Sequence, residues 1–146
     1  MRWCIVLKGI DPVLTGELLK VLDEMGHGDQ LVIADRNYPA ASSGLPVVRV
    51  GEIGVVRLMT AILSVFPLDT FVVHPIERME AEDDPTVTND TIDTVLRLGR
   101  ASHPLPLEYG VIPRFQFYER ARQASAVVLT LESAPYCDFI ITKGVV

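Results

Sequence analysis

Apolar and polar positions along the chain follow two rhythms that predict helices and strands in turn. The stretch LTGELLKVLDEMG (14–26) has apolar side chains at helical spacing, with Thr15 placed as N-cap and Gly26 as the C-terminal stop. The run QLVIAD (30–35) that follows is typical of a short buried strand. The same two patterns predict helices over 54–66, 89–100 and 114–124, and strands over 47–50, 70–74, 125–132 and 137–146.

The remaining segments are predicted to be loops. Residues 77–88 are acidic and are expected to form a surface loop, and residues 102–113 carry three prolines and are expected to be irregular apart from a short extended piece. Strands that alternate with helices indicate one α/β domain over 1–146, with a largely parallel central sheet flanked by helices on both faces. Ligands of such sheets bind beyond the carboxyl ends of strands, which directs attention to Asp35.

Composition narrows the classes of partner. The chain has 146 residues, 49% of them hydrophobic and 22% charged, and a formal net charge of −6, so neither nucleic acid nor an anionic membrane is expected as the main partner. The first ten residues hold too short an apolar run for a signal peptide, and a cytoplasmic location is expected. Cys4 and Cys137 are expected to be two ordinary thiols, with a disulfide between them as the alternative.

His27 lies between two glycines where the first helix is expected to end. One interpretation is a surface histidine that caps the helix. The other is a general acid–base group, because the flanking glycines remove side-chain bulk and let a ligand approach, and imidazole can both give and take a proton. Asp29 and Asp35 follow closely, and each could be a turn residue or part of the same site.

Other chemistries are less well supported by the pattern. A metal site built from His27 and the nearby aspartates has no HxH or HExxH spacing behind it, and His74 and His103 precede prolines in separate loops and are expected to be structural. The segment GHGDQL lacks the third glycine of a dinucleotide fingerprint and precedes a strand rather than a helix. The spacing therefore favours neither a metal site nor a dinucleotide site.

Two further segments carry candidate binding residues. Arg114 opens the helix RFQFYERA, and its guanidinium could hold sugar hydroxyls or a carboxylate, or form a surface ion pair. Tyr136 and Asp138 surround the turn APYCDF that leads into the last strand. Alone, this is an ordinary turn.

Taken in order, the segments ELLKVLDEMGHGDQLVIAD, NYPA, RFQFYERA and APYCDFIITKG resemble the family of L-fucose mutarotase and D-ribose pyranase, and the fucose branch more closely. The resemblance implies an isomerase that interconverts sugar anomers without a cofactor, in carbohydrate metabolism. It assigns His27 as the catalytic histidine, and Asp35, Arg114, Tyr136, Cys137 and Asp138 as sugar-binding residues. It also implies a ring-like homo-oligomer, typically a decamer, with sites near subunit contacts.

The chain departs from the family pattern at two places. Asp138 stands where asparagine is usual, which removes two hydrogen-bond donors and adds a charge, and Arg36 and Asn37 stand where small residues or a histidine are commoner. These departures bear on the preferred sugar rather than on the reaction. The alternatives to a fucose mutarotase are a D-ribose pyranase, a sugar-binding protein without turnover, and a metal-dependent hydrolase.

Overall fold

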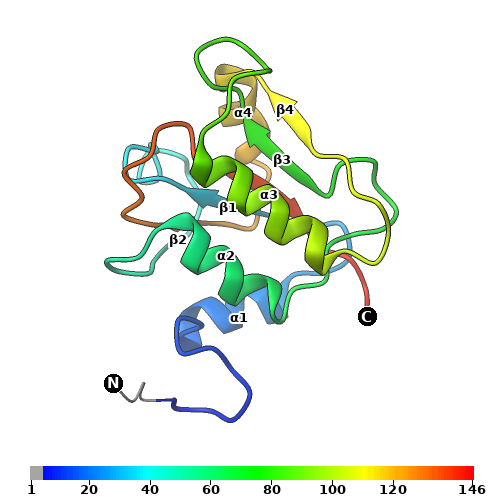
Figure 1. Cartoon of the computed structure of the whole chain (residues 1–146). Coiled ribbons are helices and arrows are strands. Elements are labelled where there is room, and N and C mark those ends of the chain that lie inside the picture. The colour runs from blue at the N-terminus through cyan, green and yellow to red at the C-terminus, as the bar shows by residue number, and fades with distance from the viewer. Residues whose placement is uncertain (1–4) are drawn as a thin grey trace.

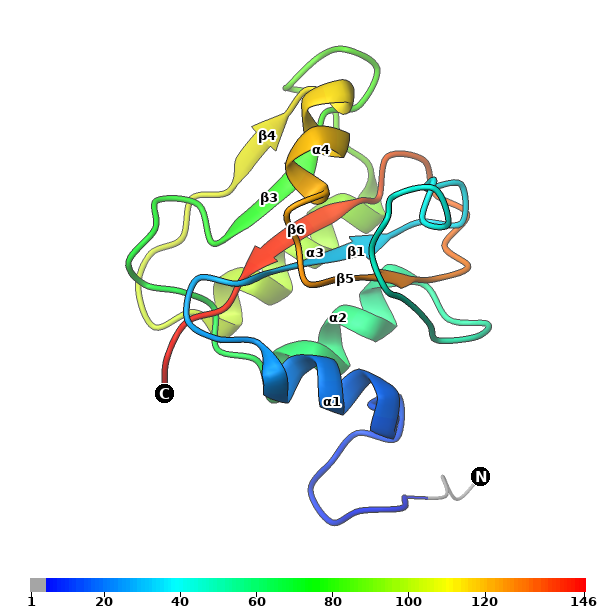
Figure 2. The same cartoon turned by 180° about the vertical axis from the view of Figure 1, so that it is seen from behind.

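A six-stranded mixed sheet forms the centre of the computed structural model, which describes residues 5–146 (Figures 1 and 2). The strands lie in the order β2-β5-β1-β6-β3-β4. In chain order the elements are α1 (Gly16–Glu24), β1 (Gln30–Ala34), β2 (Val47–Arg49), α2 (Val55–Leu63), β3 (Ile76–Met79), α3 (Asp90–Ser102), β4 (Gly110–Ile112), α4 (Arg114–Ala121), β5 (Ala126–Leu129) and β6 (Phe139–Thr142).

Helices cover both faces of the sheet, as the alternating pattern predicts. Three of them, α1, α2 and α3, pack on one face, and α4 lies alone on the other (Figures 1 and 2). Strand β1 shows the alternation directly, because Leu31 and Ile33 belong to the larger core while Val32 and Ala34 belong to the smaller one. All four side chains are fully buried, as expected of a central strand. The two ends of β1 lead into loops at opposite ends of the sheet.

The expectation of a largely parallel sheet needs a correction at its centre. Five strands run in one direction, but β6 is antiparallel to both of its neighbours, β1 and β3. The cause is the connection from β5 to β6, which runs over residues 130–138 without a helix and returns the chain at the edge where β5 ends. A parallel return would need a crossover of a dozen or more residues.

The strand predicted over 70–74 is wrong. Residues 70–74 form an irregular loop in which Phe71 and Val73 are about three-quarters exposed, and the strand of this region is β3, within the stretch expected to be an acidic loop. Both charged residues of β3 are buried, because Arg120 of α4 binds the Glu77 carboxylate with two hydrogen bonds and Arg78 donates to the carbonyls of Met79 and Pro85. Partners distant in sequence therefore let a charged segment enter the sheet.

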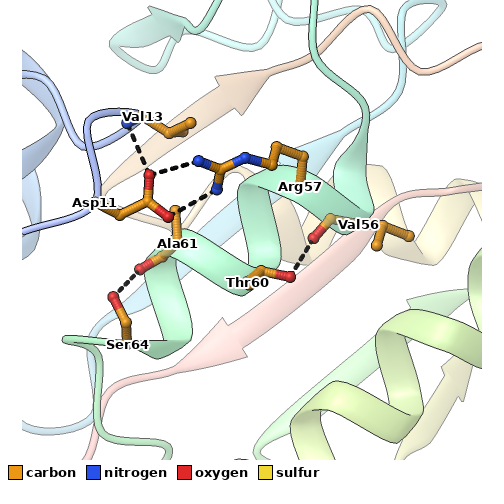
Figure 3. A network of polar contacts seen from close by, with 7 residues as sticks. All are labelled: Asp11, Val13, Val56, Arg57, Thr60, Ala61 and Ser64. Carbon is orange, nitrogen blue, oxygen red and sulfur yellow. Dashed lines mark hydrogen bonds and ion pairs between the residues drawn. The ribbon is translucent and has the colours of Figure 1, made fainter. Parts of the chain in front are cut away.

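Local polar contacts fix the helix starts. The Thr15 hydroxyl accepts a hydrogen bond from the Leu18 backbone and caps α1 as predicted. The loop before α1 is held to α2 by Asp11, which accepts two hydrogen bonds of 2.7 Å from the Arg57 guanidinium (Figure 3). This pairing lowers the pKa of the Asp11 carboxyl.

The longest helix among residues 5–146 is α3 with 13 residues, and none there is long and apolar enough to cross a membrane.

Candidate functional site

Strand β1 separates the two groups of predicted site residues. His27 precedes the strand and Asp35 follows it, so they lie at opposite ends of a five-residue strand, which spans roughly 16 Å. Figure 2 shows the loop after α1 beside the C-terminal segment at one end of the sheet, and the loops after β1 and β5 at the other. One chain therefore does not bring His27 together with Asp35.

At the first end, the His27 imidazole is bound by a carboxylate that the sequence did not reveal. Its Nε2 atom lies 2.9 Å from Oδ1 of Asp69, whose side chain is only 2% exposed, whereas the His27 side chain is 44% exposed. The Phe71 ring packs against the imidazole with centroids 5.2 Å apart. Among the described residues, Nδ1 of His27 has no hydrogen-bond partner. An imidazole held at one nitrogen and open at the other is suited to proton transfer.

Contacts from β6 and the residues after it hold this histidine loop in place. The Lys143 ammonium donates to the carbonyls of Leu22 and Met25 at the end of α1, and the Lys143 carbonyl accepts from Gly28, whose φ of +88° favours glycine. A groove of about 610 Å³ opens beside His27, and apolar residues of α1, of the loop after α2 and of the C-terminal segment line much of it.

At the other end of β1, a polar cavity of about 250 Å³ collects most of the predicted binding residues. Asp35, Arg114, Tyr136 and Asp138 all line it, together with Asn37, Tyr38, Met79, Tyr118 and Pro135. These residues come from the loop after β1, from β3, from α4 and from the turn before β6. Carboxyl groups, a guanidinium and aromatic rings in one cavity of this size suit a small polyhydroxylated ligand.

The two aspartates are the most buried polar groups of the cavity. Asp138 accepts a hydrogen bond of 2.8 Å from the Asp35 backbone, and Asp35 accepts one of 2.9 Å from the Asn37 backbone. Burial and the negative charge of Asp35 raise the pKa of Asp138 well above its usual range. A protonated Asp138 can donate a hydrogen bond, which an ionised carboxylate cannot.

The neighbours of these residues have different surroundings. Tyr136 has a φ of +58°, which is uncommon for a residue other than glycine and marks a tightly constrained turn. The buried Cys137 side chain belongs to the larger core, and burial raises the pKa of its thiol to about 12. Arg36 points away from the cavity, because its guanidinium donates to the Leu131 carbonyl. Cys4 lies outside the described residues.

Sequence reasoning missed Asp69, Tyr38 and Tyr118 as site residues. Asp69 reaches His27 across 42 positions of sequence, and no local pattern marks it. Tyr38 belongs to the motif NYPA and Tyr118 to the motif RFQFYERA, and both line the cavity. From the sequence alone, however, both tyrosines could equally have been core residues. Their rings pack together with centroids 5.6 Å apart and form one wall of the cavity.

The remaining candidates take structural positions. Asp29 accepts a hydrogen bond of 2.7 Å from the Gly26 backbone, as a turn residue does. His74 and His103 contact backbone carbonyls of Glu108, Leu105 and Asp69. Within residues 5–146, no three His, Cys, Asp or Glu side chains are grouped so that they could hold a metal ion.

The fold and the site together define an α/β protein with a mixed sheet, a polar cavity at the carboxyl end of β1 and a histidine at its other end. The chain belongs to the RbsD / FucU transport protein family, whose sequence profile matches residues 8–146. It is 42% identical over 144 residues to the L-fucose mutarotase of Histophilus somni strain 2336, covering 96% of this chain and 97% of that protein.

Solved structures agree with this assignment. FucU from Bifidobacterium longum superposes with a TM-score of 0.88 at 46% identity and covers 95% of this chain and 99% of its own. The fucose mutarotase of Streptococcus pneumoniae, solved in complex with L-fucose, gives a TM-score of 0.83 at 35% identity and covers 96% and 99%.

Proposed function

We propose that this protein is a cofactor-free mutarotase that interconverts the anomers of L-fucose or a closely related sugar. The observation that carries the proposal is the polar cavity formed by Asp35, Arg114, Tyr136 and Asp138, in a chain about 40% identical to L-fucose mutarotases over nearly its whole length. The fucose complex of the pneumococcal relative supports a monosaccharide as the ligand.

The reaction needs only proton transfers. A base removes the proton of the anomeric hydroxyl while an acid protonates the ring oxygen, and the bond between C1 and that oxygen breaks to give the open-chain aldehyde. Rotation about the C1–C2 bond exposes the other face of the aldehyde, and the ring closes by the same steps in reverse. General acid–base catalysis supplies about 10²–10⁴-fold in rate, which is a useful gain on a reaction that already proceeds in water.

His27 is the proton carrier in this proposal. The Asp69 carboxylate accepts a hydrogen bond from Nε2–H of His27. The Nδ1 lone pair of the neutral imidazole is then available as a base. Once Nδ1 has taken the sugar proton, the imidazolium lies beside the buried Asp69 carboxylate, which stabilises the positive charge. Asp35, Arg114 and Asp138 hold the sugar hydroxyls, and the turn at Tyr136 and Cys137 orients the ring.

The site is completed between two subunits. His27 and the sugar cavity lie at opposite ends of β1, so a second copy must place its His27 at the cavity of the first. Exposed apolar side chains accompany both halves. Phe71 packs against His27, Val73 follows two residues later in the same loop, and Phe115 lies beside Arg114, and each of the three is more than 70% exposed. Two different patches of one chain that meet head to tail generate a closed ring when the rotation allows it. We propose such a ring, and the decamer as its size.

The test of the activity is magnetisation-exchange NMR on L-fucose, with D-ribose measured in parallel and a chelator present. His27→Ala is expected to lower the exchange rate of the fucose anomers by about 10²–10⁴-fold while the protein still binds the sugar. His74→Ala, which replaces a half-buried histidine that contacts the Glu108 carbonyl, is the matched control and keeps the wild-type rate.

Three results would contradict the proposal. A folded His27→Ala protein that exchanges the anomers at the wild-type rate would remove His27 from the reaction. Sugar binding without exchange in the wild type would make the protein a sugar carrier. Pyranose–furanose exchange of D-ribose faster than anomer exchange of fucose would make it a ribose pyranase.

A further inference from the structure

Two buried carboxyl groups share the sugar cavity. Asp35 is 6% exposed and Asp138 is 3% exposed, and the Asp35 backbone N–H donates a hydrogen bond of 2.8 Å to Oδ1 of Asp138. Within residues 5–146, no lysine, arginine or histidine forms an ion pair with either carboxyl. Two carboxylates that line one poorly solvated cavity repel each other when both are ionised, so one of the two keeps its proton.

We propose that Asp35 and Asp138 share one proton and act as a clamp on two hydroxyls of the sugar. The acid O–H of the pair donates to one hydroxyl, and the carboxylate oxygens accept from the other. The clamp rests on the proposed sugar-binding function of this cavity. The acid donor of this clamp exists only while the pair keeps its proton.

The ionisable groups around the pair determine which ionisation can change the sugar affinity with pH. The other ionisable side chains that line the cavity are Tyr38 of the loop after β1, Arg114 and Tyr118 of α4, and Tyr136 of the turn before β6. Arg122, after α4, lines a separate pocket with Tyr38, and the Cys137 side chain lies in the larger core. Burial raises the pKa of Tyr38, so its hydroxyl stays neutral, and burial keeps the Cys137 thiol neutral as well. The Arg114 guanidinium lies over the Phe115 ring at 4.5 Å, on the exposed side of α4.

Loss of the shared proton therefore removes the donor and leaves two negative charges facing the sugar. The expected result is that L-fucose affinity, measured by titration calorimetry as a function of pH, falls about tenfold per pH unit above the pH at which the pair loses this proton. Asp138→Asn keeps a permanent donor, and its affinity is expected to be independent of pH there. A wild-type affinity that stays constant above the pH at which infrared spectra show the proton to be lost would overturn the clamp.

Tyrosine ionisation is the competing cause of such a decline. Tyr118→Phe and Tyr136→Phe remove the two cavity phenols other than Tyr38, and in both variants the affinity is expected to start falling at the same pH as in the wild type. A decline that disappears in either phenylalanine variant but persists in Asp138→Asn would assign the titration to the tyrosine and overturn the proposal.

The proton itself can be observed without sugar. Infrared spectra of the free wild-type protein near neutral pH are expected to contain the carbonyl band of a protonated carboxylic acid. Asp138→Asn loses the band, and Asp69→Asn, which replaces the other buried aspartate, keeps it. Asp35→Asn is a second variant, in which the band disappears at a lower pH because the neighbouring negative charge is gone.

The two measurements separate the two proposals. No band in the wild type would mean that both carboxyls are ionised, and the shared proton would be wrong. A band that behaves as expected in a protein that binds no monosaccharide at any pH would confirm the shared proton and overturn both the clamp and the proposed function.

Discussion

Asp69 determines what each nitrogen of His27 can do. Its carboxylate faces Nε2, its backbone carbonyl lies 3.0 Å from Nε2 of His103, and its backbone N–H donates to the Thr142 carbonyl. These contacts fix the carboxylate in a buried position from which it selects one tautomer of the imidazole. Asp69 is thus a positioning residue, which acts on the sugar only through His27.

The first prediction concerns this contact. Asp69→Asn offers an amide that can donate to Nε2 and so favours the wrong tautomer, and the anomer exchange rate is expected to fall on the order of 10²-fold or more. The sugar affinity should change little, because the cavity lies at the other end of β1. The readout is exchange NMR as a function of pH, beside a binding titration. Asp23→Asn, an exposed aspartate at the same groove, is the control and retains the wild-type rate.

Asp138 should also make stability depend on pH. Its pKa is raised in the folded protein, chiefly by burial and then by Asp35, so between the unfolded and folded pKa values the folded state holds a proton that the unfolded state has released. This contribution lowers the free energy of unfolding as pH rises above about 4. Asp138→Asn removes it.

Urea unfolding at about pH 5 and about pH 8 measures the effect. Relative to wild type, the variant is expected to be more stable at the higher pH than at the lower one. The difference is about 1.4 kcal/mol for each pH unit between the two conditions in which Asp138 is protonated in the folded state and ionised in the unfolded state. An equal difference at both pH values would show that Asp138 ionises normally.

At the scale of elements, the segment after β6 is packed tightly against the loop that carries Asp69. Gly144 donates to the Pro67 carbonyl, and an isolated bridge joins Leu68 to Lys143. A Cβ atom at position 144 would lie 2.8 Å from the Asp69 Cα and 2.9 Å from the Leu68 carbonyl oxygen. Both are backbone atoms, so the loop itself would have to move.

Gly144→Ala is therefore expected to act on stability and activity together. Displacing the loop should cost about 1–3 kcal/mol in the free energy of unfolding. It should also slow anomer exchange, because Asp69 leaves its place beside His27. Gly16→Ala is the matched control: no heavy atom lies within 4 Å of a Cβ at the start of α1, and alanine favours the helix. A Gly144→Ala protein with wild-type stability would contradict this packing.

Elements with one regular pattern could be predicted from the sequence, and elements whose charges are neutralised from a distance could not. Strand β1 is a continuous apolar run, and α1 has both its spacing and its cap in sequence. Strand β3 contains Glu77 and Arg78, and their burial depends on Arg120 and on the Pro85 carbonyl. The apolar residues 71–73 have the pattern of a strand but lie exposed in a loop.

The same division holds for the site. Asp35, Arg114 and Asp138 meet in one cavity because each stands at the end of an element that the sequence does predict. The separation of His27 from these three residues follows from strand β1, because His27 precedes the strand and Asp35 follows it. The sequence pattern predicts this strand as well. The role of Asp69 depends on a fold-level contact, as does the proton shared with Asp35, so neither could be read from spacing.

At the scale of the whole molecule, sharing between subunits can be tested by mixing defects. His27→Ala and Arg114→Ala damage opposite halves of the site, and each alone is expected to abolish most of the exchange. When the two variants are co-expressed in equal amounts, random assembly should join an intact histidine to an intact cavity at about a quarter of the contacts. Exchange NMR on the mixed assembly should then recover about a quarter of the wild-type rate. No recovery would place the whole site within one chain.

The placement of His27 and Asp35 at the two ends of one strand also determines how many complete sites an assembly of a given size contains. In the proposed ring, a lone subunit would carry two half-sites and no complete site, and an open pair would have one complete site for two chains. Closure of the ring would give every chain a complete site, because the last free histidine would then meet the last empty cavity. Turnover per chain would accordingly fall on dilution before any chain unfolds, and β1 would act as the spacer that keeps adjacent centres apart.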